Sequence, residues 1–119
     1  MRRKPGGLVP LERAICETAA GLHRSGIEEV HGYELAKRLS DIADKRLLTA
    51  YGTLYRALGR MEQMGLLKSR WEDPAIPARE NRPGRRLYRL TGAGKAAARE
   101  AAAADRTTAR RVRRRLASA

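Results

Sequence analysis

The sequence predicts a mainly α-helical fold with a small two-stranded antiparallel β-sheet and a long C-terminal helix. Apolar residues recur at helical spacing in three segments before residue 66. Two short segments with alternating polarity follow, and an alanine-rich run then favours a helix to near the end of the chain. The 119 residues suffice for one domain with an extension. We therefore expect a flexible basic arm at residues 1–8, a domain at 9–91 and a C-terminal helix at 92–119.

The first two predicted helices supply most of the domain's apolar surface. Pro10 suits the first position of a helix, and an apolar stripe then runs to a stop near Gly26. The stripe consists of Leu11, Ile15, Ala19 and Leu22. A second, short helix spans residues 32–39, with its leucines turned inward and its charged residues outward. Cys16 lies in the first stripe and is interpreted as a small buried side chain rather than a redox sensor.

The third predicted helix spans residues 49–64. Thr49 is a good N-cap residue, and Gly65 ends the helix. Leu54, Leu58 and Met61 fall on one face. The opposite face carries a hydroxyl and two guanidinium groups, from Thr53, Arg56 and Arg60.

Two segments of alternating polarity, residues 66–71 and 85–90, predict an antiparallel ribbon with one buried side. Leu67 and Trp71 share a face in the first segment, and Tyr88 and Leu90 in the second. We call residues 66–90 the wing and residues 72–86 its tip. The connection at 72–84 contains three prolines and is expected to lack secondary structure of its own.

Thr91 can cap a final helix that runs to about Leu116. This helix is too long to be covered by so small a domain, which favours self-association; an isolated alanine-rich helix is the alternative. A seam of mostly small residues would face the partner, formed by Ala97, Ala101, Ala104, Thr108, Val112 and Leu116. For the arginines at 110–115, a favourable interaction with the helix dipole is preferred over DNA binding.

The net charge of +13, carried mostly by arginine, indicates a polyanionic partner, although a solvated basic surface is an alternative. The chain contains no metal-ligand spacing, no paired base and nucleophile, and no complete phosphate-loop motif. We therefore expect no enzyme activity, no metal and no cofactor. A single cysteine and the lack of a long apolar run predict a cytoplasmic protein without a membrane segment.

The order of three helices, strand, long loop, strand and helix is that of a winged helix-turn-helix domain, whose third helix fits the DNA major groove. Three stretches also resemble the PadR family of transcriptional regulators: HGYELAKRL at 31–39, YGTLYRALGRMEQMGLL at 51–67 and RRLYRLTGAG at 85–94. The resemblance implies a homodimer that binds an inverted repeat in double-stranded DNA and represses transcription. It also implies dimer contacts from the first and last helices, including Leu11 and Ile15, as in short members with a single C-terminal dimerisation helix.

The resemblance further implies that the segment Gly52 to Tyr55 opens the reading helix onto DNA. Arg56 stands where the family often has proline, which adds a contact to a base or a phosphate. The full set of predicted DNA contacts is Tyr33, Lys37, Thr49, Tyr51, Gly52, Thr53, Tyr55, Arg56, Arg60, Arg79, Arg82, Arg85 and Arg86. Control by a small-molecule effector and control without one both remain open. The rival functions are non-specific nucleic-acid binding and a winged-helix module that binds protein.

Overall fold

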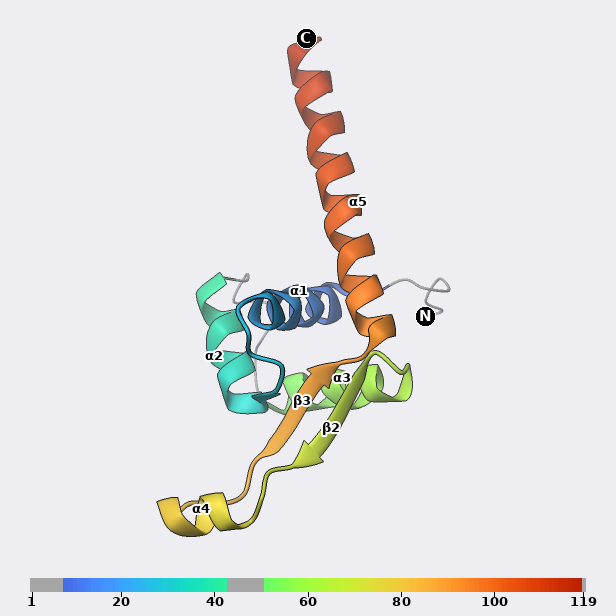
Figure 1. Ribbon diagram of the computed structural model, residues 1–119. Coiled ribbons are helices and arrows are strands. Elements are labelled where there is room, and N and C mark those ends of the chain that lie inside the picture. The colour runs from blue at the N-terminus through green and yellow to red at the C-terminus, as the bar shows by residue number, and fades with distance from the viewer. Residues whose placement is uncertain (1–7, 43–50, 119) are drawn as a thin grey trace.

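The computed structural model describes residues 8–42 and 51–118. It is mainly helical, with a small antiparallel sheet and a long last helix (Figure 1). The predicted fold class is confirmed. The elements in chain order are α1 (Pro10–Arg24), β1 (Val30–His31), α2 (Gly32–Ile42), α3 (Tyr51–Gln63), β2 (Leu67–Trp71), α4 (Ala75–Glu80), β3 (Arg86–Leu90) and α5 (Gly92–Ala117).

The core forms where α1, α2 and α3 meet above the sheet. Its largest fully buried side chains are aliphatic, as expected for a chain without phenylalanine: Ile15, Leu35, Leu39, Leu54, Leu58 and Met61. Cys16 is also fully buried, and burial, together with the nearby carboxylate of Glu12, raises the pKa of its thiol to about 11. The thiol is therefore protonated and unreactive in the folded protein, which agrees with its interpretation as a packing residue.

The sheet has three strands rather than the predicted two. Its order is β1-β3-β2, and all neighbours are antiparallel. Val30 pairs with Tyr88 in the added strand, and Ser69 pairs with Tyr88 from the other side. The prediction missed β1 because a segment of two residues is too short to show an alternating pattern.

The wing tip contains the short helix α4, which corrects the expectation of a connection without secondary structure. Its prolines are compatible with a helix, because Pro74 immediately precedes it and Pro77 lies in its first turn. The backbone N–H groups of a first turn have no partner within the helix, so proline removes no hydrogen bond there. Asp73 starts the helix by accepting the Ala75 N–H at 3.0 Å, and Asn81 ends it with a left-handed φ of 53°.

Hydrogen bonds and a close backbone contact hold the wing and α5 together at their junction. The Thr91 hydroxyl accepts the Gly94 N–H at 3.1 Å, which confirms Thr91 as the cap of the last helix. The backbone N–H of Thr91 donates to the Leu66 carbonyl at 3.0 Å. A Cβ atom at Gly94 would overlap that same carbonyl oxygen, so only glycine permits this close approach.

Helix α5 packs on α1 through its first turns and then projects away from the domain, on the side opposite α4 and the wing tip (Figure 1). Gly94, Ala98 and Ala101 are its buried residues. Within residues 8–42 and 51–118, no helix is long and apolar enough to cross a membrane. The same part of the chain holds no cluster of three side chains suited to bind a metal ion.

Candidate nucleic-acid interface

Helix α3 has one face that is fixed in the core and one that is open to solvent. Leu54, Leu58 and Met61 are all 0% exposed, as the sequence predicted for the inner face. Because three consecutive turns are anchored in this way, the helix cannot rotate about its axis. The opposite face is exposed along its length and carries Gly52, Tyr55, Arg56, Gly59 and Arg60.

The first turns of α3 gather hydrogen-bond donors on this open face. The Arg56 guanidinium folds back toward the start of the helix, where its Nη2 donates to the Thr53 hydroxyl at 3.4 Å. Gly52 leaves room for it, since a Cβ atom at that position would lie 3.5 Å from Arg56 Nη1. A hydroxyl and a guanidinium at the start of a groove-sized helix are the groups that read base edges in the major groove.

Arg60, one turn further along α3, has an internal partner that the sequence did not predict. Its Nε donates to Glu12 Oε2 at 3.3 Å, and the Glu12 side chain is 0% exposed. The other carboxylate oxygen of Glu12 accepts the backbone N–H of Val9 at 3.2 Å. Arg60 therefore joins α3 to the start of α1 and balances a buried charge.

Two predicted contacts, Tyr33 and Lys37, lie one turn apart on the exposed side of α2. The Tyr33 ring stacks on His31, with centroids 6.3 Å apart. His31 Nδ1 accepts the backbone N–H of Glu34 at 3.2 Å, so its imidazole caps α2 in the neutral form. Burial and the nearby positive charge of Arg85 lower the pKa of His31, which keeps this cap neutral.

Tyr55 connects the open face of α3 to α2. A Cβ atom at Gly32, the first residue of α2, would lie only 2.6 Å from the Tyr55 hydroxyl oxygen. The tyrosine ring thus lies directly against the glycine, while 46% of the residue remains exposed. Thr49 and the side chain of Tyr51, two further predicted contacts, lie outside the described residues.

Arg82, one of the predicted DNA contacts, is held within the wing tip by partners that the sequence did not predict. Its Nη1 and Nη2 donate to the two carboxylate oxygens of Glu72 at 2.5 and 3.1 Å, and its Nε donates to Glu80 at 2.9 Å. Only 17% of the Arg82 side chain is exposed. The hydrogen bond to Arg82 lowers the pKa of Glu72, whose carboxylate also accepts the Arg85 backbone N–H at 2.9 Å. These hydrogen bonds join the residues that precede α4 to those that follow it.

The other three predicted wing arginines lie at the surface. Arg79 on α4 and Arg85 are exposed. Arg86 is half-buried: its Nε donates to the Ser69 hydroxyl at 2.9 Å, and its guanidinium lies 5.4 Å from the centre of the Trp71 ring. Trp71 is 63% exposed, although its alternation with Leu67 predicted a buried side chain. Its position at the end of β2, beyond the helices that cover the sheet, explains the difference.

A pocket of about 380 Å³, which sequence reasoning missed, lies between α2, α3 and the wing. Its wall is mostly aromatic and includes His31, Tyr33, Tyr55, Trp71 and Tyr88. Arg85 and Arg86 complete the wall. The tyrosines were singled out individually, but only the fold brings these distant segments together.

The predicted dimerisation residues fall into three groups. Leu11 and Ile15 are 7% and 0% exposed and pack in the core of the protomer, and their role as dimer contacts stays a prediction. Ala97 and Ala101 pack at the junction with α1. The exposed remainder of the seam, on the projecting part of α5, comprises Ala104, Thr108, Val112 and Leu116.

Comparison with solved structures finds the same fold in PadR regulators. A PadR family transcription regulator from Clostridium difficile R20291 superposes with a TM-score of 0.71 at 24% identity, over 89% of this chain and 97% of that one. One from Eggerthella lenta DSM 2243 gives 0.62 at 28% identity, over 89% and 85%. Bacillus subtilis PadR, solved in complex with operator DNA, gives 0.55 at 21% identity, over 79% and 47%.

Sequence comparisons give a family but no individual relative. No curated protein sequence matches the chain. The model of the transcriptional regulator PadR-like family matches residues 22–100, from the end of α1 into α5. This segment contains the start of the last helix and also α2, α3 and the wing, which form the candidate interface. The chain therefore belongs to the PadR-like family of transcriptional regulators.

Proposed function

We propose that the protein is a homodimeric, sequence-specific repressor that binds a pseudo-palindromic operator. The observation that carries this proposal is the two-faced geometry of α3. One face is completely buried, and the other presents Thr53 and Arg56 at its open first turns. Such a helix enters the major groove as a rigid body. Relatives in the family support this use, since Bacillus subtilis PadR was solved with operator DNA.

In this proposal the interface divides into reading and positioning groups. Thr53 and Arg56 read base edges, because they share the start of α3. The other exposed predicted side chains, except Arg60, contact phosphates and set the register together with the half-buried Arg86. They are Tyr33, Lys37, Tyr55, Arg79, Arg85 and Arg86.

A second copy of the chain would cover the outer half of α5. Val112 is 52% exposed and Leu116 is 71% exposed, on the part of the helix that extends beyond the domain. Two copies related by a two-fold axis would place their α3 helices in major grooves about one helical turn, roughly 34 Å, apart. An inverted repeat with that spacing is the matching operator, and a dimer bound there would block transcription.

Single alanine variants test which residues read bases and which contact phosphates. Thr53→Ala and Arg56→Ala should reduce the preference for a selected sequence over random duplex, with a loss of about 1–3 kcal/mol per base contact. Arg85→Ala should weaken binding to both duplexes to the same extent. Gel shifts on the two duplexes at matched salt measure the difference. Equal losses on both duplexes for all three variants would contradict the proposal and favour non-specific binding, and no shift by wild type would favour the protein-binding module.

The dimer is tested with a pair of matched substitutions on α5. Val112→Glu places a charge on the face proposed to be covered, and should shift the chain toward monomer in light scattering. Ala103→Glu changes the charge in the same way at an exposed position. It lies about 180° away around the helix, since nine residues make two and a half turns. This control should leave the dimer intact, and equal behaviour of both variants would contradict the proposed interface.

An effector, if the protein uses one, would act in the 380 Å³ pocket between α2, α3 and the wing. The aromatic wall and the guanidinium groups of Arg85 and Arg86 suit a flat anion. Because Arg85 is also a proposed DNA contact, an occupant would compete with DNA. Trp71 lines the pocket and is the chain's only tryptophan, so its fluorescence reports binding directly. A molecule that quenches Trp71 and releases DNA would support this role, and quenching without release would oppose it.

A further inference from the structure

A line of cationic side chains runs along one side of α5, from its second turn almost to its end. It consists of Lys95, Arg99, Arg106, Arg110 and Arg113, which we call the basic stripe. Their separations of 4, 7, 4 and 3 residues match an α-helix with 3.6 residues per turn, so all five project from the same side. At a rise of 1.5 Å per residue the stripe is about 27 Å long.

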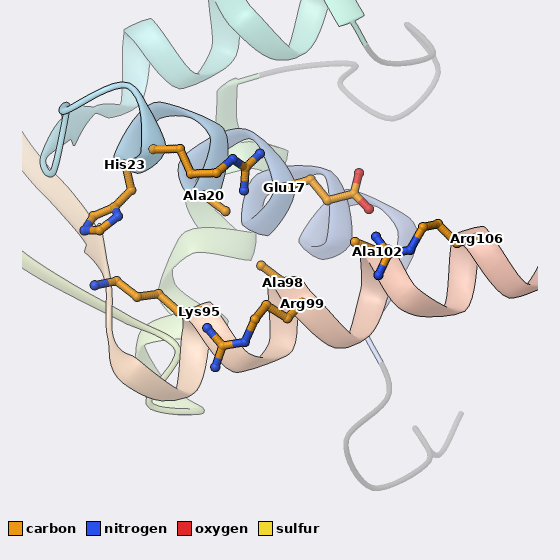
Figure 2. A pocket seen from close by; sticks show the side chains of 9 residues that line it. Glu17, Ala20, His23, Lys95, Ala98, Arg99, Ala102 and Arg106 are labelled. Atoms are coloured by element: carbon orange, nitrogen blue, oxygen red, sulfur yellow. The ribbon is translucent and has the colours of Figure 1, made fainter.

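The inner half of the stripe borders a groove between α1 and α5 of about 520 Å³. Figure 2 shows Lys95, Arg99 and Arg106 along α5, with His23, at the end of α1, opposite Lys95. The space between the two helices is lined by small side chains, namely Ala20, Ala98 and Ala102. Arg24 of α1 adds another guanidinium to the wall.

Glu17 in the groove wall and its neighbour Asp105 are engaged with each other or with another cation. Glu17 is the carboxylate in the groove wall. Its pKa is raised by burial and by a hydrogen bond with Asp105. Asp105 itself pairs with Arg13 of α1. Within residues 8–42 and 51–118, no member of the basic stripe forms an ion pair.

The basic stripe lowers the stability of α5 as a helix, which indicates that these cations have a role other than stabilising the helix. Lys95 lies in the first turns of α5, close to the N-terminus, where the helix dipole disfavours cations. Lys95 with Arg99, and Arg106 with Arg110, are like charges four residues apart and repel each other. The dipole account that suits the arginines at 110–115 does not apply to this end of the helix.

The stripe is separate from both surfaces assigned above. The projecting part of α5 lies on the side of the domain opposite the wing tip (Figure 1). Residues two apart in a helix are about 160° apart around its axis. Arg106 and Arg110 therefore point away from Ala104 and Thr108, which belong to the proposed dimer seam. Self-association would leave the stripe uncovered.

We propose that the basic stripe of α5 binds the phosphate backbone of a second stretch of duplex DNA. Duplex DNA carries a negative charge about every 1.7 Å along its axis, so a straight line of cations about 27 Å long meets several phosphates at once. Guanidinium groups fork onto phosphate oxygens. A small anion would use only one or two of the five cations. The protein would thus hold two DNA segments together, one at α3 and the wing and one at α5.

The test compares two triple variants of the full chain with the same charge change. Arg99→Ala/Arg106→Ala/Arg110→Ala removes three stripe residues, and Arg111→Ala/Arg114→Ala/Arg115→Ala removes three arginines whose mean direction around the same helix is about 110° away. Alanine preserves helix propensity in both. Wild type bound to an immobilised duplex should capture a second, labelled random-sequence duplex. The stripe variant should lose most of this capture while still binding the first duplex, and the control should retain it.

The salt dependence of binding to random duplex gives a second measurement. The three lost contacts should reduce the slope of log affinity against log salt by about 2.7, at 0.9 per phosphate, and the control should change it much less. Equal effects of the two variants, or no capture by wild type, would overturn the proposal. Stronger binding of the stripe to single-stranded RNA or to polyglutamate than to duplex DNA would also overturn it. Because random DNA is used throughout, these results do not depend on whether α3 reads a sequence.

Discussion

The guanidinium of Arg60 on α3 donates to the carboxylate of Glu12 on α1 at 3.3 Å, across 48 residues of sequence. Glu12 is 0% exposed, whereas the Arg60 side chain is 45% exposed. The ion pair thus connects the solvent side of α3 to a buried charge near the N-terminus of the domain. It sets the position of α3 on α1 and leaves Arg56 as the guanidinium directed along the open first turns.

Replacing Arg60 should therefore damage stability more than recognition. Arg60→Ala removes a partner from a buried carboxylate and should lower the free energy of unfolding by about 1–3 kcal/mol. Urea denaturation measures this loss. Arg56→Ala, one turn earlier on the same helix, is the matched control and should change stability by less than about 0.5 kcal/mol. Equal stability of the two variants would show that the pair contributes nothing to the fold.

Gly32→Ala should disturb DNA binding through Tyr55. The new methyl group would meet the Tyr55 hydroxyl oxygen at 2.6 Å, so the ring must move. Because Tyr55 is 46% exposed, it can swing aside, and the cost in stability should stay below about 1 kcal/mol. Affinity for duplex DNA should fall, as measured by fluorescence anisotropy. Unchanged affinity would mean that the position of Tyr55 is unimportant for binding.

Gly59→Ala provides the complementary case on α3 itself. Nothing lies within 4 Å of a Cβ atom at this position, and the residue is exposed within the helix. Alanine should stabilise the fold by about 0.5–1 kcal/mol, because glycine loses more backbone entropy in a helix. Thermal unfolding checks the sign. A lower melting temperature would indicate that Gly59 makes a close approach that the structure does not contain.

Glu72→Gln should loosen the wing tip. The substitution removes the negative charge that holds Arg82, and trypsin should then cleave the 79–85 region severalfold faster at neutral pH. Glu80→Gln removes only the second contact of Arg82 and should have a smaller effect. Acid should act in the same direction. The pKa of Glu72 is lowered in the fold, so its contribution is present above the ordinary value of 4.5 and is lost as pH falls through the lowered value. Equal cleavage of both variants would contradict this role.

His31 should make stability depend on pH in a higher range. Its pKa is lowered from 6.5, so the unfolded chain binds the proton more readily and stability decreases as pH falls below about 6.5. Protonation also removes the acceptor for the Glu34 N–H. The loss should be a fraction of the ~1 kcal/mol of a helix cap. His31→Asn keeps a capping group that does not titrate. The unfolding free energy of this variant should change less between pH 7.5 and 5.5 than that of wild type. If the unfolding free energy of the variant depends on pH as strongly as that of wild type, His31 is not the source of this dependence.

The sequence predicted the parts of the fold that local periodicity determines. The ends of α1, the inner face of α3 and the cap at Thr91 all follow from patterns within one or two helical turns. The two longer strands were placed to within a residue. Strand β1 and helix α4 were missed because the first is too short to show a period and the second begins with prolines that its first turn tolerates.

The candidate interface was predicted as a set of residues but not as a set of contacts. Arg60 and Arg82 carry the same charge as Arg56 and Arg85, and nothing in the local sequence separates them. Their partners Glu12 and Glu72 are 48 and 10 residues away, so only the tertiary structure shows which guanidinium groups are engaged. Similarly, the apolar stripe that contains Leu11 and Ile15 does not reveal which surface will cover it.

Selection of bound sequences from a library of random duplexes tests the central claim most directly. Wild-type protein should enrich an inverted repeat whose half-sites are centred about 10 base pairs apart, one helical turn. The same selection with Arg56→Ala should lose information at one position of each half-site, while Arg60→Ala, after correction for folded protein, should return the wild-type motif. If wild type enriches no motif, α3 does not read sequence, and the protein binds DNA through charge alone.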